Sequence, residues 1–365
     1  METLLAVREL AEERITIELL TPDPHFVYRP MVVAEVFGAG EEHRFDLSRV
    51  CDDQGARLHV DGLSRVDPER HVVQTSTGLE LEYDALVVAR GARVRDAVPG
   101  AITFSGRRDI EAMRTVLDAA ATPAGGVRRL VFAGPGGLTW MLPLYELAML
   151  TRAHLDERGR EDVEIVVATS ESLPLGAFGP LAGETVRELL DDRRIELVTG
   201  HYPTAFRDGE LHLVPERALE ADVVVALPWL EGPWIDGLPA DDHGFLPIDV
   251  HGAVRGVGDV YAAGDATDFP IKQGGLASQE ADAVAEMIAA RAGASVTPRP
   301  FVPVLRGVLL TGDAPTYLRS EISGGRGVSS ISNSPLWWPP SKIAGRHLAP
   351  YLALRPGLRE THQAV

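Results

Sequence analysis

Short apolar runs that have the composition of buried strands alternate with helical patterns along most of this chain. Parallel strands need long and usually helical connections, so the alternation indicates parallel β-sheets covered by helices. The sequence therefore predicts an α/β fold made of two interleaved units. The strand-like runs are ITIELL (15–20), YDALVVARGA (83–92), RLVFAGPGG (129–137), VEIVVAT (163–169), IELVTG (195–200) and ADVVVALP (221–228), helical patterns occupy 2–13, 140–153, 183–191 and 274–290, and a short β-meander is expected from 56–62, 71–76 and 79–84.

Proline and glycine cluster at 93–106, 228–246 and 294–304. Such residues punctuate helices and strands, so these stretches are where we expect the chain to cross between units. The last 60 residues or so differ in kind, because they are rich in Pro, Trp and Leu. The predicted organisation is a discontinuous first domain (1–105 and 229–300), a second domain (106–228) and a small C-terminal segment (301–365).

Composition excludes several classes of protein. The chain has 365 residues, of which 45% are hydrophobic, enough for two domains with apolar cores. It carries 35 Lys and Arg against 53 Asp and Glu, and the resulting charge of -18 argues against nucleic acid as a main partner. Cys51 is the single cysteine, which excludes an intramolecular disulfide, a CxxC redox pair and a multi-thiolate metal site. No metal site is predicted.

Neither end of the chain reads as a membrane-spanning segment. The chain has no run of 18 apolar residues, and METLLAVRELAEERITIELL at the start has charges throughout, so a cytoplasmic protein is expected. The tail carries Trp337 and Trp338 beside Lys342, Arg346 and Tyr351. This group suggests either an interfacial patch that rests on a membrane or aromatic packing onto the first domain. Peripheral membrane contact is therefore left open.

One stretch, DVYAAGDATDFPIKQGG (259–275), combines groups that suit a polar cofactor. Gly264 lets a ligand approach the backbone, and the carboxylate of Asp265 can accept hydrogen bonds from sugar-like hydroxyls. The helical pattern that follows, GGLASQEADAVAEMIAA, directs its amino-terminal N–H groups to the same place. This arrangement suits an electron-rich ring held above a polyol. The alternative is an aspartate that caps a turn.

These motifs together resemble the FAD-dependent pyridine nucleotide oxidoreductases, flavoproteins with two dinucleotide-binding domains, and in particular the branch of type II NADH dehydrogenases and sulfide:quinone oxidoreductases. The resemblance is carried by PHFVYRP, YDALVVARGA, GFLPIDVHGAVRGVGDVYAAGDAT and KQGGLASQEAD, in this order. It implies two Rossmann-like domains that bind FAD and NAD(P)H. By this resemblance the cofactor-binding residues are Tyr28, Arg29, Pro30, Gly91, Ala92, Gly134, Gly136, Gly264, Asp265, Gln273, Gly274 and Gly275, and the catalytic residue is Lys272.

The resemblance also implies individual roles. Asp265 would bind the ribityl chain, and the helix after Gly275 would face the pyrimidine end of the flavin. Lys272 and Gln273 would lie beside the reactive edge of the ring, where a lysine stabilises developing charge. For Lys272 a solvated surface position is the alternative. For Tyr28, which the resemblance places in a segment passing the flavin, the alternative is loop packing.

The chain departs from the family pattern in the first unit. The usual first strand and its G-x-G-x-x-G turn, which hold the pyrophosphate, are absent, and Met1 aligns inside the first helix. We therefore expect this chain to hold FAD weakly, and we expect codons upstream of Met1 to encode the missing strand and turn. Thr21 replaces the acid that binds the adenosine ribose, with Asp23 as a substitute or as part of a turn. Arg90 replaces the threonine that usually precedes the glycine.

The second unit has an imperfect glycine-rich turn. Gly134 and Gly136 follow a strand at the right spacing, but Thr139 replaces the third glycine and Pro143 falls in the next helix. Glu171 follows the next strand, where a ribose-binding acid is expected. Two readings stay open: a site for NAD(P)H, or a domain that kept its shape and lost its ligand.

The leading prediction for function is an FAD-dependent oxidoreductase that transfers electrons from NAD(P)H through flavin to a small acceptor such as a quinone. Two alternatives remain. One is a protein similar to sulfide:quinone oxidoreductases that lacks their cysteine pair. The other is a non-catalytic or shortened flavoprotein remnant. The predicted partners are a small-molecule electron donor and acceptor, and formation of a homodimer is left open.

Overall fold

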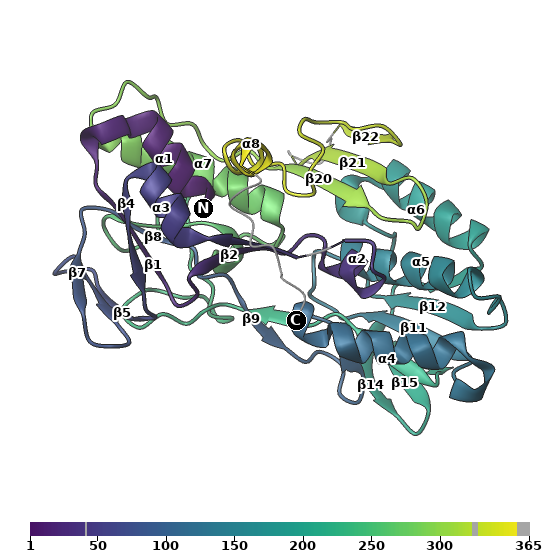
Figure 1. Cartoon of the computed structure of the whole chain (residues 1–365). Coiled ribbons are helices and arrows are strands. Elements are labelled where there is room, and N and C mark those ends of the chain that lie inside the picture. Colours follow the sequence, from purple (N-terminus) through teal and green to yellow (C-terminus); the bar gives the residue numbers. More distant parts are fainter. Residues whose placement is uncertain (41, 323–327, 356–365) are drawn as a thin grey trace.

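The computed structural model describes residues 1–40, 42–322 and 328–355. It has two lobes, and the chain passes between them more than once (Figure 1). The second lobe is built on a five-stranded parallel sheet in the order β10-β17-β11-β12-β13. Its strands are β10 (Ile102–Thr103), β11 (Arg129–Gly134), β12 (Glu164–Thr169), β13 (Ile195–Val198) and β17 (Val223–Ala226).

The two faces of this sheet are covered differently. Successive strand residues point to opposite faces, so Leu130 and Phe132 of β11 pack under helices, while Val131 and Ala133 face a small antiparallel sheet. Both faces are therefore buried, which explains the continuous apolar runs. The covering elements are the helices α4 (Ile110–Ala121), α5 (Leu142–Asp156) and α6 (Pro180–Asp192), and the strands β14 (Tyr202–Arg207), β15 (Glu210–Val214) and β16 (Arg217–Glu220).

The first lobe contains two parallel strand pairs, β1–β4 and β8–β19. No backbone ladder joins the two pairs in the part of the chain that the structure describes. The expected meander is β5-β6-β7, so placing 56–62 in it was wrong: β4 pairs in parallel with β1 instead. The strands are β1 (Ile17–Thr21), β4 (Ala56–Val60), β5 (Leu63–Asp67), β6 (Val72–Thr75), β7 (Glu80–Glu82), β8 (Leu86–Val88) and β19 (Val260–Ala262).

Helix α1 (Glu2–Ala11) packs along α7 (Gly274–Arg291), as Figure 1 shows at the top of the first lobe. Ala6 and Ala11 meet Ala285 and Ala289, and all four side chains are fully buried. Small side chains let the two helix axes approach closely, so α1 fixes the position of α7 in the lobe. Beside them lie α3 (Leu47–Gln54), β2 (His25–Tyr28) and β3 (His43–Asp46).

Two segments that join the lobes pair with each other. The strands β9 (Arg93–Arg95) and β18 (Trp229–Glu231) form a short antiparallel ladder, and they lie inside two of the predicted crossing regions. A third connection follows Tyr28, because α2 (Val32–Val36) packs on α4 of the second lobe. There Arg114 of α4 donates to the Glu35 carbonyl at 2.9 Å. The predicted domain boundaries remain predictions.

The C-terminal segment forms a three-stranded antiparallel sheet over the second lobe and a short helix beside α7 (Figure 1). Lys342 reaches from this segment to Glu146 of α5, with Nζ at 2.6 and 2.8 Å from the two carboxylate oxygens. Both side chains are almost fully buried. The elements are β20 (Val304–Leu309), β21 (Thr316–Glu321), β22 (Ser329–Ser332) and α8 (Leu348–Leu354).

Pro143, which the sequence places inside a helix, stands at the second position of α5. Its missing N–H costs nothing there, because the first N–H groups of a helix have no partner within the helix. Cys51 is buried in α3, as its small apolar character predicts. Among the helices of the described ranges, none is long and apolar enough to cross a membrane.

We expect Lys342→Met to lower the free energy of unfolding by about 3–5 kcal/mol, because it leaves the Glu146 carboxylate buried without its cation. Burial already raises the pKa of Glu146, and the Lys342 ammonium opposes that rise. Urea unfolding measures the loss, and the double variant Glu146→Gln/Lys342→Met should recover most of it. The exposed pair Arg65–Asp236 supplies the control, since Arg65→Met should cost no more than about 1 kcal/mol. A loss for Lys342→Met as small as the control's would contradict the prediction.

Candidate functional site

The turn after β19 presents an acidic side chain at the carboxyl end of a strand. Gly264 has a φ of +80°, a left-handed conformation that favours glycine, and the chain then makes one short helical turn over Gly264–Ala266. Because β8 runs parallel to β19, the ends of both strands meet at one edge of the first lobe. Gly91 and Ala92, just after β8, therefore lie at the same edge as Gly264 and Asp265.

Asp265 is half-buried, and no residue that the structure describes donates a hydrogen bond to its carboxylate. Burial raises the pKa of Asp265, and the positive charges of Lys272 and Arg29 oppose that rise. A carboxylate that is partly removed from water and has no protein donor is stabilised by a ligand that supplies one. The alternative of a capping aspartate is not supported, because this side chain caps no described backbone group. The role of Asp265 in binding a polyol stays a prediction.

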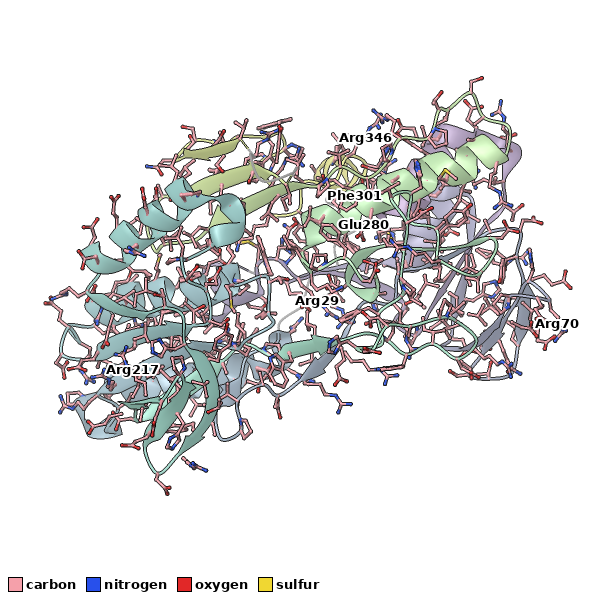
Figure 2. The ribbon with its side chains drawn as sticks, turned by 180° about the vertical axis from the view of Figure 1, so that it is seen from behind. Arg29, Arg70, Arg217, Glu280, Phe301 and Arg346 are labelled. Carbon is pink, nitrogen blue, oxygen red and sulfur yellow. The ribbon has the colours of Figure 1, made fainter. Side chains whose placement is uncertain are left out.

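Glu280 of α7 holds this turn in place, and the sequence-based predictions missed it. Its Oε2 accepts the backbone N–H of Gly264 at 2.6 Å, and Oε1 accepts the Thr267 hydroxyl at 3.3 Å. The side chain is 2% exposed, and burial raises its pKa to about 7. A carboxylate amid the small and apolar residues of GGLASQEADAVAEMIAA was the signal in the sequence. Figure 2 shows Glu280 near the middle of the molecule, as it does Arg29.

Lys272 is half-buried beside Asp265. Its ammonium donates to the Thr267 carbonyl and lies 3.8 Å from the centre of the Phe245 ring. Burial lowers the pKa of Lys272, and Asp265 is the first of the nearby acids that oppose the fall. These contacts favour a position at the candidate site over a freely solvated lysine, and the catalytic role of Lys272 stays a prediction. Lys272 supplies positive charge close to Asp265.

The amino terminus of α7 faces the same region, but part of it is used by the protein itself. Gln273 caps the helix, since its Oε1 accepts the Leu276 N–H at 2.9 Å and its Nε2 donates to the Arg306 carbonyl at 3.1 Å. A Cβ on Gly274 would lie 2.8 Å from the Ile343 side chain. Gly274 thus allows close approach by the C-terminal segment, and Gly275 follows inside the first turn.

Tyr28 anchors the C-terminal segment beside α7. Its hydroxyl accepts the Ile343 N–H at 3.3 Å, and burial raises its pKa. Both expectations for Tyr28, a position near the site and a packing role, are compatible with this contact. Arg29 and Pro30 continue from Tyr28 toward the second lobe, and the Arg29 side chain is exposed.

The expected interfacial patch of the tail does not form as a group. Lys342 is buried against Glu146, and Tyr351 is 6% exposed, so including these two residues was wrong. Trp337 packs edge-on against Tyr317 and donates to the Ser341 carbonyl at 2.9 Å. Trp338 is 87% exposed. Of the three aromatic residues, Tyr351 packs on the first lobe, as the alternative expected, whereas Trp337 packs within the C-terminal segment.

The glycine-rich turn of the second lobe is occupied by protein side chains. A Cβ on Gly134 would lie 2.8 Å from the Met141 sulfur, so this glycine permits close packing of β11 on the start of α5. A Cβ on Gly136 would lie 2.5 Å from the Tyr202 ring, and Trp229 donates to the Gly136 carbonyl at 2.8 Å. The space that a glycine opens to a nucleotide is filled here by Tyr202.

Two acids considered for ribose binding are already engaged. Glu171 accepts the hydroxyl of Tyr145 at 2.6 Å, and burial raises the pKa of both groups, that of Tyr145 well above its usual value. Asp23 accepts the His25 N–H at 2.9 Å and pairs with Arg44 at 3.2 Å. These contacts support the alternative that Asp23 forms part of a turn.

Comparison with known proteins identifies the family of this chain and several relatives. Residues 4–286 match the family described as "Pyridine nucleotide-disulphide oxidoreductase". The ferredoxin reductase component of a chlorobenzene dioxygenase from Cupriavidus sp. (strain PS12) is 29% identical over 79% of this chain and 70% of its own length. An NADH dehydrogenase-like protein of Mycobacterium tuberculosis (strain CDC 1551 / Oshkosh) is 28% identical over 61% of this chain. That match covers 58% of the relative, less than two thirds of its length.

The fold also matches a solved structure. The sulfide:quinone oxidoreductase of Aquifex aeolicus superimposes with a TM-score of 0.81 at 18% identity, over 91% of this chain and 84% of that one. At this identity the likeness concerns the fold alone. The predicted α/β class, with two interleaved Rossmann-like domains, is confirmed.

We expect the stability of this protein to fall as pH rises from about 5 to 7, in part through Glu280. Folding raises the pKa of Glu280 from 4.5 to about 7. At low pH Glu280 is protonated in both the folded and the unfolded state, and the folded state loses this proton only near pH 7. The unfolded state loses the proton first, and folding stability therefore declines across this interval, by at most about 3 kcal/mol from this group.

Urea unfolding at several pH values checks this expectation. Glu280→Gln keeps an acceptor for Gly264 but carries no titrating proton, so the decline should be smaller than in the unmodified protein. Glu196→Gln, an exposed acid of the second lobe, should leave the profile unchanged. Identical profiles for Glu280→Gln and the unmodified protein would show that Glu280 does not titrate in this range.

Proposed function

The chain belongs to the pyridine nucleotide-disulphide oxidoreductase family, and from this premise we propose that it is an FAD-dependent enzyme that carries electrons from NAD(P)H to a small acceptor, with a quinone as the first candidate. The observation that carries the proposal is Asp265, a half-buried carboxylate without a protein donor, at the end of a parallel strand and beside the amino terminus of a long helix. The oxidoreductase class follows from the family. The cofactor and the substrates are our proposal.

The residues of the first lobe fit a flavin. Asp265 would bind the hydroxyls of the polyol chain, because a carboxylate accepts such donors strongly. The amino terminus of α7 and the Lys272 ammonium would favour negative charge on the ring. Bound flavin would supply hydride acceptance and electron transfer, for which no amino-acid side chain is suited. Glu280 contributes by positioning the turn, since its oxygens are already used by Gly264 and Thr267.

The second lobe has the frame of a nicotinamide nucleotide site, with Tyr202 lying across it. Tyr202 is 49% exposed, so its ring can turn away into solvent without disturbing the core. The Gly136 carbonyl would stay bound to Trp229, and the backbone of the glycine-rich turn would then be open to a phosphate. We propose that NAD(P)H binds here with displacement of Tyr202.

The C-terminal segment supplies the wall nearest to α7, and we propose that the acceptor enters beside it. Ile343 lies against Gly274, and the half-buried Trp337, which packs on the buried Tyr317, provides aromatic surface farther along the segment. Flat apolar acceptors such as quinones suit a wall of this kind. The relative whose name includes a quinone shares this fold. Sulfide as donor is less suited, because Cys51 is buried in α3 and has no second cysteine to relay sulfur.

We expect Asp265→Asn to weaken FAD binding by about 10- to 100-fold, because it removes a charge-assisted hydrogen bond worth about 1.5–3 kcal/mol. Titration of FAD into flavin-free protein, followed by flavin fluorescence, measures the dissociation constant. Asp236→Asn is the matched control, since Asp236 is an exposed acid of the same lobe. Equal affinity of the unmodified protein and Asp265→Asn for FAD would remove Asp265 from the site.

We expect anaerobic NADH or NADPH to bleach the flavin absorbance of the FAD-loaded protein. Tyr202→Ala should lower the concentration needed for half-maximal bleaching by several-fold, because the nucleotide no longer displaces a ring. Trp234→Ala removes an equally exposed aromatic residue away from the turn and should have no effect. Flavin that does not bleach with either nucleotide would overturn the proposed donor, and a higher half-maximal concentration for Tyr202→Ala would show that the ring aids binding.

A further inference from the structure

Three metal-ligating side chains meet at a point that the proposed reaction does not use. Glu2 comes from α1, Asp282 from the middle of α7, and His347 from the residue before α8. One ligand atom of each lies within 4.8 Å of the others. The three residues are far apart in sequence, so no local spacing motif could have revealed them. The cluster joins the amino-terminal helix, the helix of the cofactor site and the C-terminal segment.

His347 is oriented as a metal-binding histidine would be. Its side chain is 6% exposed, and Nδ1 lies 2.9 Å from the Glu9 carboxylate. That contact favours a proton on Nδ1, and a neutral ring with this tautomer directs its Nε2 lone pair at the cluster. Nε2 makes no hydrogen bond to any residue in the described ranges, and it lies 3.7 Å from Asp282 Oδ1. The carboxylate–histidine pair is the arrangement that orients histidine ligands in metal sites.

Asp282 and Glu2 provide two oxygen ligands from different helices. Asp282 Oδ1 is buried and has no hydrogen-bond donor. Glu2 is held rigidly, because its two oxygens accept the N–H groups of His347 at 2.6 Å and Leu348 at 2.9 Å. Each of these oxygens keeps a second lone pair.

The charged groups around the cluster are of both signs. Besides its three members, the acids are Glu9 of α1 and Glu286 of α7. The cations are the Arg346 guanidinium, 4.0 Å from Glu286, the Arg299 guanidinium, which pairs with Glu286, and the Met1 amino group beside Glu2. A divalent ion would neutralise the Glu2 and Asp282 carboxylates together.

We propose that Glu2, Asp282 and His347 bind a divalent transition-metal ion of the zinc class, with one nitrogen and two oxygen ligands and a further position open to water. Tetrahedral Zn²⁺ with bonds of about 2.0–2.2 Å places its ligand atoms roughly 3.4 Å apart. Asp282 Oδ1 and His347 Nε2, 3.7 Å apart, lie near that spacing, and the three ligand atoms lie within 4.8 Å of one another. The ion would fasten α1 and the start of α8 to α7. It would therefore stabilise the C-terminal segment against the helix of the cofactor site.

Zinc titration of the full chain, after treatment with EDTA and removal of the chelator, tests the proposal. We expect one Zn²⁺ per chain by calorimetry and a rise in the unfolding temperature on its addition. His347→Gln and Asp282→Asn should each weaken Zn²⁺ binding by tenfold or more and abolish that rise. Circular dichroism and thermal unfolding without zinc report whether each variant folds. Asp282→Asn keeps the size of the side chain, so it preserves the test if His347→Gln does not fold.

Two further variants distinguish a specific zinc site from adventitious zinc binding. Glu9→Gln touches no ligand position but removes the carboxylate that orients His347, and it should weaken Zn²⁺ binding by about 10- to 100-fold. His59→Gln alters another histidine–carboxylate pair, 2.7 Å from Glu18, and should leave Zn²⁺ binding unchanged. No saturable zinc binding by the unmodified chain, or equal affinity in the unmodified protein and Asp282→Asn, would overturn the proposal.

Discussion

The hydrogen bonds from Gly264 and Thr267 to the buried carboxylate of Glu280 determine how the candidate site is assembled. They join the turn after β19 to the second turn of α7, so the acid that follows the strand and the amino terminus of the helix face the same space. Burial of Glu280 makes these bonds strong and makes their loss costly. Asp265, which receives no such bond in the described structure, is left available for a ligand.

The C-terminal segment depends on similar polar contacts between distant parts of the chain. It is attached to the second lobe by the Lys342–Glu146 pair, to β2 by the Tyr28–Ile343 contact and to α1 by Glu2. A segment held at three points to both lobes adds to the stability of their relative placement. The wall beside the amino terminus of α7 exists only when this segment is docked, so the geometry of an acceptor site is tied to the folding of the tail.

The second lobe shows how a nucleotide-binding frame can be filled by its own side chains. Gly134 serves helix packing, Gly136 lies under Tyr202, and Glu171 binds Tyr145. Each contact satisfies a group that would otherwise face a ligand. The two tyrosines of this lobe differ in exposure: Tyr202 is half exposed and can move, whereas Tyr145 is fully buried and cannot.

The sequence by itself determined the elements and the class of fold. The apolar runs of β11 and β12, the long pattern of α7 and the acid after VYAAG are local signals, because strand and helix periodicity act over a few residues. The family resemblance followed from the same segments. The sequence also placed Asp265 and Lys272 in one short stretch, so their proximity needed no tertiary information.

Only the tertiary structure decided which groups became partners. Lys342, which the sequence suggested was exposed, is buried because it pairs with Glu146, a residue 196 positions away in sequence. Strand β4 lies outside the expected meander because it pairs in parallel with β1. Other contacts also join distant segments: Tyr202 lies on Gly136, and Ile343 lies on Gly274. Glu2 accepts a hydrogen bond from His347, which is 345 residues away. Spacing along the chain carries no information about such pairs, because they form only when separately encoded elements pack against one another.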